Sequence, residues 1–363
     1  MESVVEMNYR LLEEMYRGKR VLITGHTGFK GSWLCVILKM MGAEVTGYAL
    51  EPNVKPSLFE LAGIAGGIDS VIGDVRDMEC MKKVFDVCRP EFVFHLAAQP
   101  IVREGYRCPA DTYETNVMGT VNLMECVCLS DSVKSVVNVT TDKVYQNLEV
   151  EKGYVEEDKL DGSDPYSNSK SCSELVTHSY VSSFLQEQNK AVSTCRAGNV
   201  IGGGDFEKDR IIPDCVRAVV NKEALIVRNP LSVRPYQHVL EPLFAYLMIA
   251  AGQLQKPGLA GAYNIGPDVS DCLTTGRLVD IFQSEWGEGF TWKNMDCGGP
   301  HEANLLKLDC SKLKAVFGWR PRYSAKKAVG LVTDWTKVWL DGEDIRACME
   351  RQIRDYIGCD ARK

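Results

Sequence analysis

The sequence lacks a long apolar run, an apolar leader at its start and any excess of positive charge. Its most apolar stretch, residues 239–254, is interrupted by Glu241 and Pro242 and is too short to span a membrane. The first 20 residues carry acidic side chains throughout and have no apolar core, so they do not form a secretory signal. We therefore expect a cytoplasmic protein without a membrane-spanning segment.

The charge and the cysteines exclude further classes. A net charge of −7 argues against a nucleic-acid partner, although it leaves room for a local basic pocket that binds an anionic small molecule. There are 14 cysteines, but no CxxC pair occurs among them. Reduced cysteines packed as small core residues are the natural interpretation, and no metal site is expected.

Short apolar runs alternate with helical patterns through the first half of the chain. Strands are predicted at 20–24, 44–48, 70–73, 91–96, 134–140 and 191–197, and helices at 32–41, 78–88, 112–129 and 165–186. This alternation predicts an α/β protein with a Rossmann-type, doubly wound parallel sheet and a smaller C-terminal α/β substrate lobe. We divide the chain into a helical N-terminal extension (1–18), a dinucleotide-binding domain (19–198) and a mainly substrate-binding lobe (199–363), some elements of which return to the first domain.

A glycine-rich turn follows the first predicted strand directly. Gly25, Gly28 and Gly31 stand three residues apart, with Thr27, Phe29 and Lys30 between them. Such glycines allow a tight turn, close approach of the backbone to a pyrophosphate, and helix–strand packing. A plain turn is the alternative for the bare pattern, but the strand–turn–helix context favours a dinucleotide site of the short-chain dehydrogenase type.

Two later strand ends fit the same cofactor. Asp74, followed by Val75, ends the third strand, where a carboxylate can accept a hydrogen bond from adenine. The fourth strand ends in small or polar residues that allow close approach to the cofactor: Leu96, Ala97, Ala98 and Gln99. Glu51 lies two residues beyond the second strand, and Lys30 could bind an extra phosphate or face solvent. NAD is therefore expected, and NADP is not excluded.

The strongest chemical signal is the run from Asp164 to Lys170. Asp164 can cap a helix on which Tyr166 and Lys170, four residues apart, share a face. A nearby ammonium stabilises a phenolate and lowers the pKa of the tyrosine, which makes it a usable base. Thr141, at the end of the fifth strand, could hydrogen-bond the hydroxyl that Tyr166 deprotonates. A YxxxK pair can occur by accident on a surface helix, but the three signals in this order indicate hydride transfer.

Several segments outside these motifs carry a more specific resemblance. They include GHTGFKGSWL, HLAAQPIVR, TNVMGT, TTDKVY, RAGNVIGGGDF and RPYQHVLEPL. From about Lys19 to Trp339 the chain closely resembles the sugar-nucleotide 4,6-dehydratases, in particular the branch that acts on CDP-glucose.

The resemblance implies a reaction. Tyr166, supported by Thr141 and Lys170, would take the C4 hydroxyl proton while hydride passes from C4 to NAD. Asp142 would then protonate the leaving C6 hydroxyl, and Lys143, where related enzymes have Glu, would remove the C5 proton. Lys143 must be neutral to act as a base, so a cation that orients the substrate or polarises the ketone is the alternative. Hydride returns to C6, giving CDP-4-dehydro-6-deoxy-D-glucose and water.

The resemblance also implies a set of substrate-binding residues around the diphosphate and nucleoside: Arg103, Asn199, Arg210, Arg234 and His238. Arginine suits a diphosphate because it can donate two parallel hydrogen bonds, although each arginine could instead form an ordinary structural ion pair.

Three points stay open at this stage. A sugar-nucleotide 4-epimerase would share Tyr166 and Lys170 without needing Asp142 and Lys143, and a non-catalytic dinucleotide sensor would need none of these four residues. A homo-oligomer, dimer or tetramer, is expected to pair through the helices predicted at 112–129 and 165–186.

Overall fold

The computed structural model describes residues 9–295 and 305–358. A seven-stranded parallel sheet in the order β11-β6-β5-β4-β1-β2-β3 forms its centre. Its strands are β1 Arg20–Thr24, β2 Glu44–Ala49, β3 Asp69–Ile72, β4 Phe92–His95, β5 Ser135–Val139, β6 Ala191–Ala197 and β11 Ala262–Ile265. The strand order 3-2-1-4-5-6 is that of a doubly wound dinucleotide-binding sheet, so the predicted fold class is confirmed.

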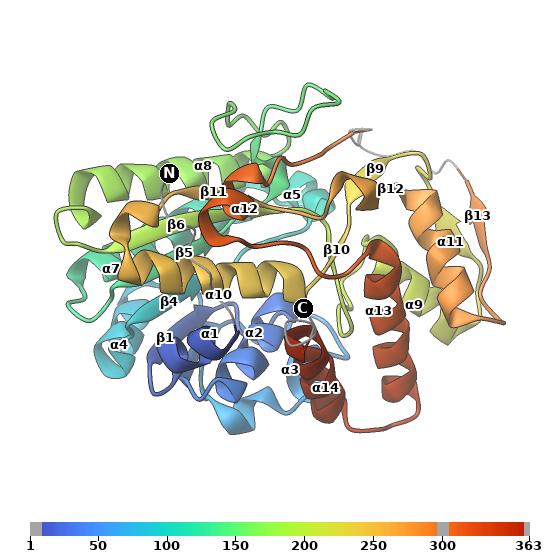
Figure 1. The fold of residues 1–363 in the computed structure, drawn as a ribbon, viewed down its shortest axis with the longest axis horizontal. Helices are drawn as coiled ribbons and strands as arrows, with labels where there is room; N and C mark the ends of the chain where they lie inside the picture. The colour runs from blue at the N-terminus through green and yellow to red at the C-terminus, as the bar shows by residue number, and fades with distance from the viewer. Residues whose placement is uncertain (1–8, 296–304, 359–363) are drawn as a thin grey trace.

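Helices cover both faces of this sheet (Figure 1). The helices are α1 Tyr9–Tyr16, α2 Phe29–Met40, α3 Leu58–Leu61, α4 Met78–Cys88, α5 Val102–Arg107, α6 Pro109–Tyr113, α7 Gly119–Leu129, α8 Pro165–Tyr180, α9 Ile211–Asn221, α10 Leu240–Gln255, α11 Thr275–Trp286, α12 Ser311–Phe317, α13 Ala325–Leu340 and α14 Ile345–Gly358. On one face α2, α10, α1 and α14 enclose the larger core, and on the other α4, α7 and α8 pack side by side. Except for the edge strand β3, the strands are buried along most of their length because helices cover both faces.

A smaller lobe lies to the right in Figure 1, built from α9, α11 and α13 around a separate core. Its short strand pairs are β8 Leu225–Val227 with β13 Trp292–Asn294, and β9 Val233–Pro235 with β12 Cys272–Thr274. A third pair, β7 Val200–Ile201 with β10 Gln237–His238, joins the lobe to the sheet domain. Late elements also return to the large domain: β11 extends the sheet beside β6, and α14 contacts α2.

The predicted elements differ from the observed ones at their ends. The helix predicted at 112–129 is α6 and α7 joined by a π-helical turn, η2 Glu114–Met118, and the predicted helix at 165–186 continues past α8 into a second such turn, η4 Val181–Leu185. Within the described residues, no helix combines the length and apolarity that crossing a membrane requires. Of the extension, residues 1–8 lie outside the described residues, while α1 packs against α10.

Candidate active site

The glycine turn is compact for a steric reason. Gly25 has a φ of +77°, and a Cβ atom there would lie 2.7 Å from the backbone nitrogen of Ala97. A Cβ on Gly31 would lie 2.1 Å from the carbonyl oxygen of Gly25. Helix α2 begins directly after Gly28, which has no side chain to cap it, so its first N–H groups face the turn. This cradle fits the pyrophosphate of a dinucleotide, which the helix dipole also favours.

The other residues of the turn have distinct positions. Thr27 donates a hydrogen bond to the carbonyl of Leu50 at 2.8 Å, which ties the turn to the end of β2. The ring of Phe29 packs against Gly202. Lys30 is half-buried. The charged groups that act on it most strongly are Arg210 and Asp142, which lie near Tyr166, and not Glu51 at the end of β2. The position of Lys30 therefore does not favour binding of the 2′-phosphate of NADP.

Asp74 lies close to where an adenine is expected, but its carboxylate already has a partner. The guanidinium of Arg76 donates to Asp74 at 2.9 and 2.6 Å and holds its pKa below the ordinary value. The adjacent Val75 is buried beneath Gly119. An adenine amino group would share this carboxylate with Arg76.

Asn116, which the sequence motifs did not single out, fixes the loop after β4 by hydrogen bonds. Asn116, in the π-helical turn η2, accepts from the backbone of Gln99 at 2.8 Å and donates to its carbonyl at 3.0 Å. It also donates to Ser169 on α8 at 2.9 Å. Leu96, Ala97 and Ala98 precede Gln99 at the carboxyl edge of the sheet. The TNVMGT segment could have indicated this residue, because Asn116 is the polar side chain at its centre.

The catalytic helix forms as its sequence predicts. Asp164 accepts a hydrogen bond from the backbone of Ser167 at 3.0 Å, and Pro165 occupies the first helical position. Tyr166 and Lys170 are both buried on α8, and Thr141 hydrogen-bonds the Tyr166 hydroxyl. The structure therefore brings together the three residues that the motifs indicated.

The charge state of Tyr166 differs from the expectation. Burial raises its pKa to about 12, and the hydrogen bond with Thr141 and the charge of Arg210 offset this only in part. The Nζ of Lys170 donates to the carbonyl of Val139 at 3.1 Å, and burial followed by the charge of Lys30 lowers the pKa of Lys170 to about 7. Desolvation thus outweighs the stabilisation of the phenolate that the YxxxK spacing suggested.

Asp142 and Lys143 form the turn that leaves β5, η3 Asp142–Val144. Asp142 is 2% exposed, and burial raises its pKa, although the charges of Lys143 and Arg234 oppose this. One carboxylate oxygen accepts from Thr141 at 3.0 Å, and the other has no hydrogen-bond partner within the described chain. The half-buried Lys143 lies beside it. A buried carboxyl group with a raised pKa can act as a general acid when it carries its proton.

A buried ion pair supports this turn, and sequence reasoning missed it as well. Glu174, one turn beyond Lys170, accepts from Thr140 at 2.5 Å and from Thr194 at 2.6 Å. It also accepts two hydrogen bonds from Arg196 on β6, at 3.0 and 2.9 Å. This network holds α8 against β5 and β6, so it fixes the residues adjoining Thr141 relative to Tyr166. The RAGN segment contains Arg196, but no spacing rule linked it to Glu174.

Two of the predicted substrate-binding arginines form ion pairs with carboxylates of the loop that precedes α9. Arg210 pairs with Asp205 at 3.0 Å, whereas Arg103 pairs with Asp209 at 3.5 Å. A further cation, Arg228, shares Asp209 at 3.3 Å. Arg234 is buried on β9, and its charge acts on Asp142. Asn199 accepts a backbone hydrogen bond from Gln237 at 3.0 Å through its carbonyl.

The structure places His238 in a buried position. Its side chain is fully buried between the rings of Trp33 and Tyr323, with centroids 6.1 and 5.8 Å away. Burial lowers its pKa to about 3, so the ring is neutral. A ring enclosed in this way belongs to the packing between α2 and the second lobe, and its position argues against contact with substrate.

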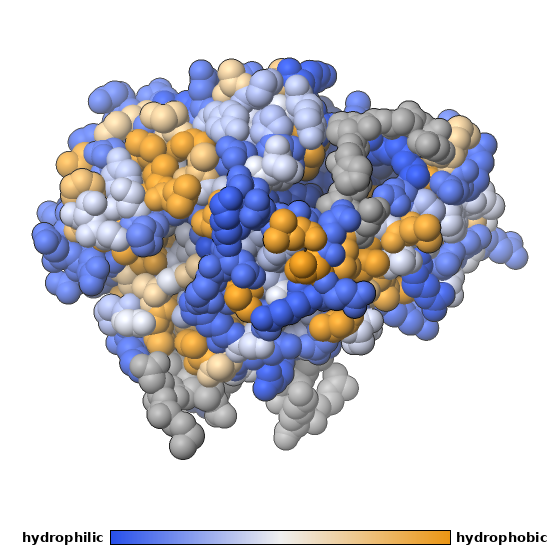
Figure 2. Space-filling model, turned by 90° about the horizontal axis from the view of Figure 1, so that it is seen from above, coloured by the Kyte–Doolittle hydropathy of each residue, from blue (hydrophilic) through white to orange (hydrophobic). Residues whose placement is uncertain are grey.

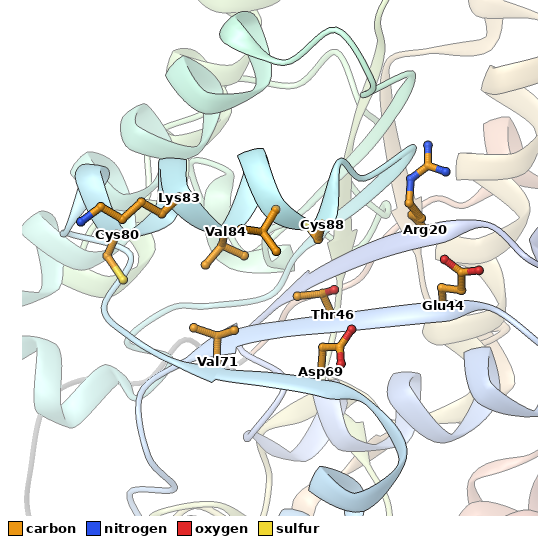
Figure 3. Close-up of a pocket in the computed structure, with 10 residues that line it drawn as sticks. Arg20, Glu44, Thr46, Asp69, Val71, Cys80, Lys83, Val84 and Cys88 are labelled. Carbon is orange, nitrogen blue, oxygen red and sulfur yellow. The ribbon is translucent and has the colours of Figure 1, made fainter.

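A surface cavity of about 480 Å³ lies elsewhere, between α4 and the strands β2 and β3 (Figure 3). Arg20, Glu44 and Asp69 line it at the beginnings of strands. Cofactors of doubly wound sheets bind at the carboxyl ends instead, so this cavity is separate from the site described above.

The sheet, the glycine cradle and the Thr141, Tyr166 and Lys170 cluster define an enzyme of the extended short-chain dehydrogenase type. Residues 22–331 match the family described as GDP-mannose 4,6 dehydratase, and the chain belongs to this family. It is 46% identical over 357 residues to a CDP-glucose 4,6-dehydratase of Salmonella typhimurium, an alignment that covers 96% of this chain and 99% of that protein.

Solved structures agree on the fold. A dTDP-glucose 4,6-dehydratase of Bacillus anthracis in complex with NAD superposes with a TM-score of 0.74 at 21% identity, covering 90% of this chain and 99% of that one. A UDP-glucose 4-epimerase of Stenotrophomonas maltophila with bound NAD gives 0.77 at 20% identity, covering 89% and 99%. Because dehydratases and epimerases share this fold, the residues of the site must distinguish the two activities.

Proposed function

We propose that this protein is a CDP-glucose 4,6-dehydratase, which converts CDP-D-glucose to CDP-4-dehydro-6-deoxy-D-glucose and water. The observation that carries the proposal is the buried Asp142, beside Lys143, Thr141 and Tyr166; one of its oxygens has no hydrogen-bond partner among the described residues. Elimination of water needs an acid and a base next to the oxidising group. The 46% identical relative, which bears this name, supports the nucleotide.

NAD is the proposed cofactor, bound by the Gly25–Gly31 cradle and the strand ends at residues 74–75 and 96–99. When bound, it supplies the oxidant for C4 and the reductant for C6, so none is consumed overall. The bound oxidised cofactor would also bring positive charge to the site, which would favour the Tyr166 phenolate that burial disfavours.

The chain's own residues handle the protons. Tyr166 takes the C4 hydroxyl proton, Thr141 holds that hydroxyl, and Lys170 supports the tyrosine from the next turn of α8. The C4 ketone acidifies the C5 hydrogen. Asp142, whose pKa is raised by burial, donates a proton to the departing C6 hydroxyl. Lys143 removes the C5 proton or, as a cation, stabilises the ketone.

Substrate binding is proposed to rely on the arginines. Arg103 and Arg210 lie at the mouth of the site with Asp209 and Asp205 as their partners, and a diphosphate can replace or share those partners. Arg234 would act closer to Asp142, and Asn199 would contact the sugar or nucleoside. His238 is not included, because it is enclosed in the core.

The test is incubation of the purified protein with CDP-glucose and NAD, followed by mass spectrometry. Loss of one water from CDP-glucose, with dTDP- and GDP-glucose inert, is the expected result. The Asp142→Asn variant should lose about 10³-fold in water elimination, because an amide cannot donate the proton, and should accumulate reduced cofactor. Asp161→Asn, which changes a half-exposed carboxylate paired with Lys159, is the matched control.

A sugar-nucleotide 4-epimerase is the alternative. Epimerisation needs the same Tyr166 and Lys170, and solved epimerases share the fold. Asp142→Asn would then leave turnover unchanged, and CDP-glucose would be converted without loss of water.

A homo-oligomer that acts in the cytoplasm is part of the proposal. Large apolar side chains are exposed along α7, α8 and η4, among them Leu129, Leu175 and Phe184. Figure 2 shows apolar groups gathered on the side of the molecule where α7 and α8 lie in Figure 1. Light scattering on the purified protein should give a multiple of the 40.4 kDa chain.

A further inference from the structure

The turn that carries Asp142 and Lys143 is held only weakly by its own hydrogen bonds. The amide of Val144 donates to the carbonyl of Thr141 at 3.4 Å, and the amide of Lys143 donates to the Thr141 hydroxyl, also at 3.4 Å. Both distances lie beyond the range of about 2.7–3.2 Å that is usual for such bonds. The position of Lys143 therefore depends on contacts at the two ends of the turn.

The beginning of the turn is anchored to β6 and to the catalytic helix. The amide of Thr140 donates to the carbonyl of Cys195 at 2.9 Å, and the Thr140 hydroxyl donates to Glu174 on α8 at 2.5 Å. Glu174 is buried and forms an ion pair with Arg196 on β6 at 2.9 Å. This end of the turn fixes Thr141, which follows Thr140 directly.

The other end of the turn is anchored through Tyr145, the residue that follows η3. Its hydroxyl accepts from the guanidinium of Arg196 at 2.8 Å and donates to the side-chain carbonyl of Asn264 on β11 at 2.6 Å. Beside it, the carbonyl of Val144 accepts from the hydroxyl of Ser171 on α8 at 2.8 Å. Tyr145 is 1% exposed, so water cannot replace its partners if they are lost.

One ion pair thus holds both ends of the segment 141–144, because its carboxylate binds Thr140 and its guanidinium binds Tyr145. The Thr140 end adjoins Thr141, which the oxidation step uses. The Tyr145 end lies closer in the chain to Lys143, which the elimination step uses. Loss of the anchor at Tyr145 should therefore disturb elimination more than oxidation.

We propose that Tyr145 is a positioning residue for the elimination of water, which acts by fixing Lys143 and Asp142 through its hydrogen bond to Arg196. This inference rests on the proposed function, since it assigns a role within that reaction. The proton transfers of the reaction stay as described above. Tyr145 takes part in none of them and only holds the groups that carry them out.

The test compares two buried tyrosines of one apolar cluster. Tyr145→Phe removes the hydroxyl that Arg196 binds. Tyr154→Phe is the matched control: its ring stacks on Tyr145 at 5.2 Å, but its hydroxyl accepts from the amide of Leu148 at 2.7 Å and donates to Asn147 at 3.0 Å. In a single turnover of CDP-glucose, Tyr145→Phe should slow the loss of water about tenfold and leave the reduction of the cofactor within about twofold of its wild-type rate.

Reduced cofactor should therefore accumulate in Tyr145→Phe and not in Tyr154→Phe. Its absorbance and the mass of the quenched sugar nucleotide follow the two steps separately. Ser171→Ala, which removes the bond from α8 to the Val144 carbonyl, should act in the same direction. It carries the test if Tyr145→Phe does not fold.

A further measurement needs no substrate. Hydrogen–deuterium exchange in the peptide 141–146 should be about tenfold faster in Tyr145→Phe than in the wild type or Tyr154→Phe, because the turn has lost an anchor. Equal behaviour of the two variants overturns the proposal, as does an equal loss of oxidation and elimination. If the wild type removes no water from CDP-glucose while the exchange still rises, the proposed function fails and only the anchoring of the turn by Tyr145 stands.

Discussion

The two sides of the active site are held in different ways. On the sheet side, the Glu174 carboxylate accepts four hydrogen bonds, and both it and Arg196 are less than 5% exposed. On the substrate side, Arg103 and Arg228 share the single carboxylate of Asp209 at 3.5 and 3.3 Å, and all three side chains are about one-third exposed.

This difference matches the tasks of the two sides. Buried, charge-assisted hydrogen bonds with every acceptor used allow one geometry only, which is what proton and hydride transfer require. Long, exposed ion pairs contribute little to stability, so a diphosphate can compete for the arginines at small cost. The hydrogen bonds on the sheet side thus hold the catalytic residues in one geometry. The weak ion pairs on the substrate side leave arginines available to bind a diphosphate.

The largest effect is expected from breaking the sheet-side network. Glu174→Gln replaces an acceptor oxygen by an NH2 group facing Thr194 or Arg196 and leaves the guanidinium buried without its counter-charge. The free energy of unfolding should fall by about 3–5 kcal/mol, as measured by urea denaturation. Activity at low temperature should fall as well, because Thr140 adjoins Thr141.

Asp161→Asn is the control for this variant. It removes a carboxylate from an ion pair with Lys159 that is about half exposed, so stability should hardly change. If the free energy of unfolding fell equally in Glu174→Gln and Asp161→Asn, the burial and the full set of hydrogen bonds of Glu174 would not be the source of its stabilising effect.

A second test concerns the seam between the sheet domain and the C-terminal segment. Glu241 on α10 is fully buried, accepts from the backbone of Arg322 and Tyr323 at 2.8 Å, and accepts from the Tyr356 hydroxyl at 2.8 Å. Burial nevertheless raises the pKa of Glu241 to about 7. The folded state therefore binds a proton more tightly than the unfolded chain does. Glu241 adds stability at low pH, and this is lost as the pH rises from its ordinary value of 4.5 to about 7, a change of about 3 kcal/mol.

The measurement compares urea denaturation of the wild type and Glu241→Gln at several pH values. The difference in unfolding free energy between them should change across this interval. The buried His238 works in the opposite sense, because its lowered pKa makes stability rise with pH, but it is present in both proteins and cancels. Glu187→Gln, an exposed change, serves as the control. A difference that is flat with pH would show that Glu241 is ionised in the folded state throughout.

Much of this arrangement follows from the sequence. The glycine spacing and the strand–helix alternation predict the sheet and the cradle, because close packing at Gly25 and Gly31 tolerates no side chain. The capped helix from Asp164 places Tyr166 and Lys170 on one face by its period alone. These are local rules, so they can be applied without a structure.

Contacts between distant segments could not be derived in this way. Asn116 and Arg196 are 53 and 22 residues from the α8 side chains they bind, and no periodicity links such pairs. The same holds for His238, whose enclosure depends on Trp33 and Tyr323 arriving from other elements. The raised pKa of Tyr166 was missed because the YxxxK pattern indicates charge proximity but not the depth of burial.

The smallest effect is expected on the substrate side. Arg103→Gln removes one of the two guanidiniums on Asp209, and Arg228 can then pair with that carboxylate alone. The local excess of positive charge disappears, so KM for CDP-glucose should rise about tenfold while kcat changes little, the signature of binding lost equally in the ground and transition states. Arg107→Gln on the same helix is the control, because Arg107 is exposed and paired with Glu104 at 2.7 Å. A loss in kcat without a change in KM would instead place Arg103 with the residues that fix the chemistry, and the division between the two sides would have to be redrawn.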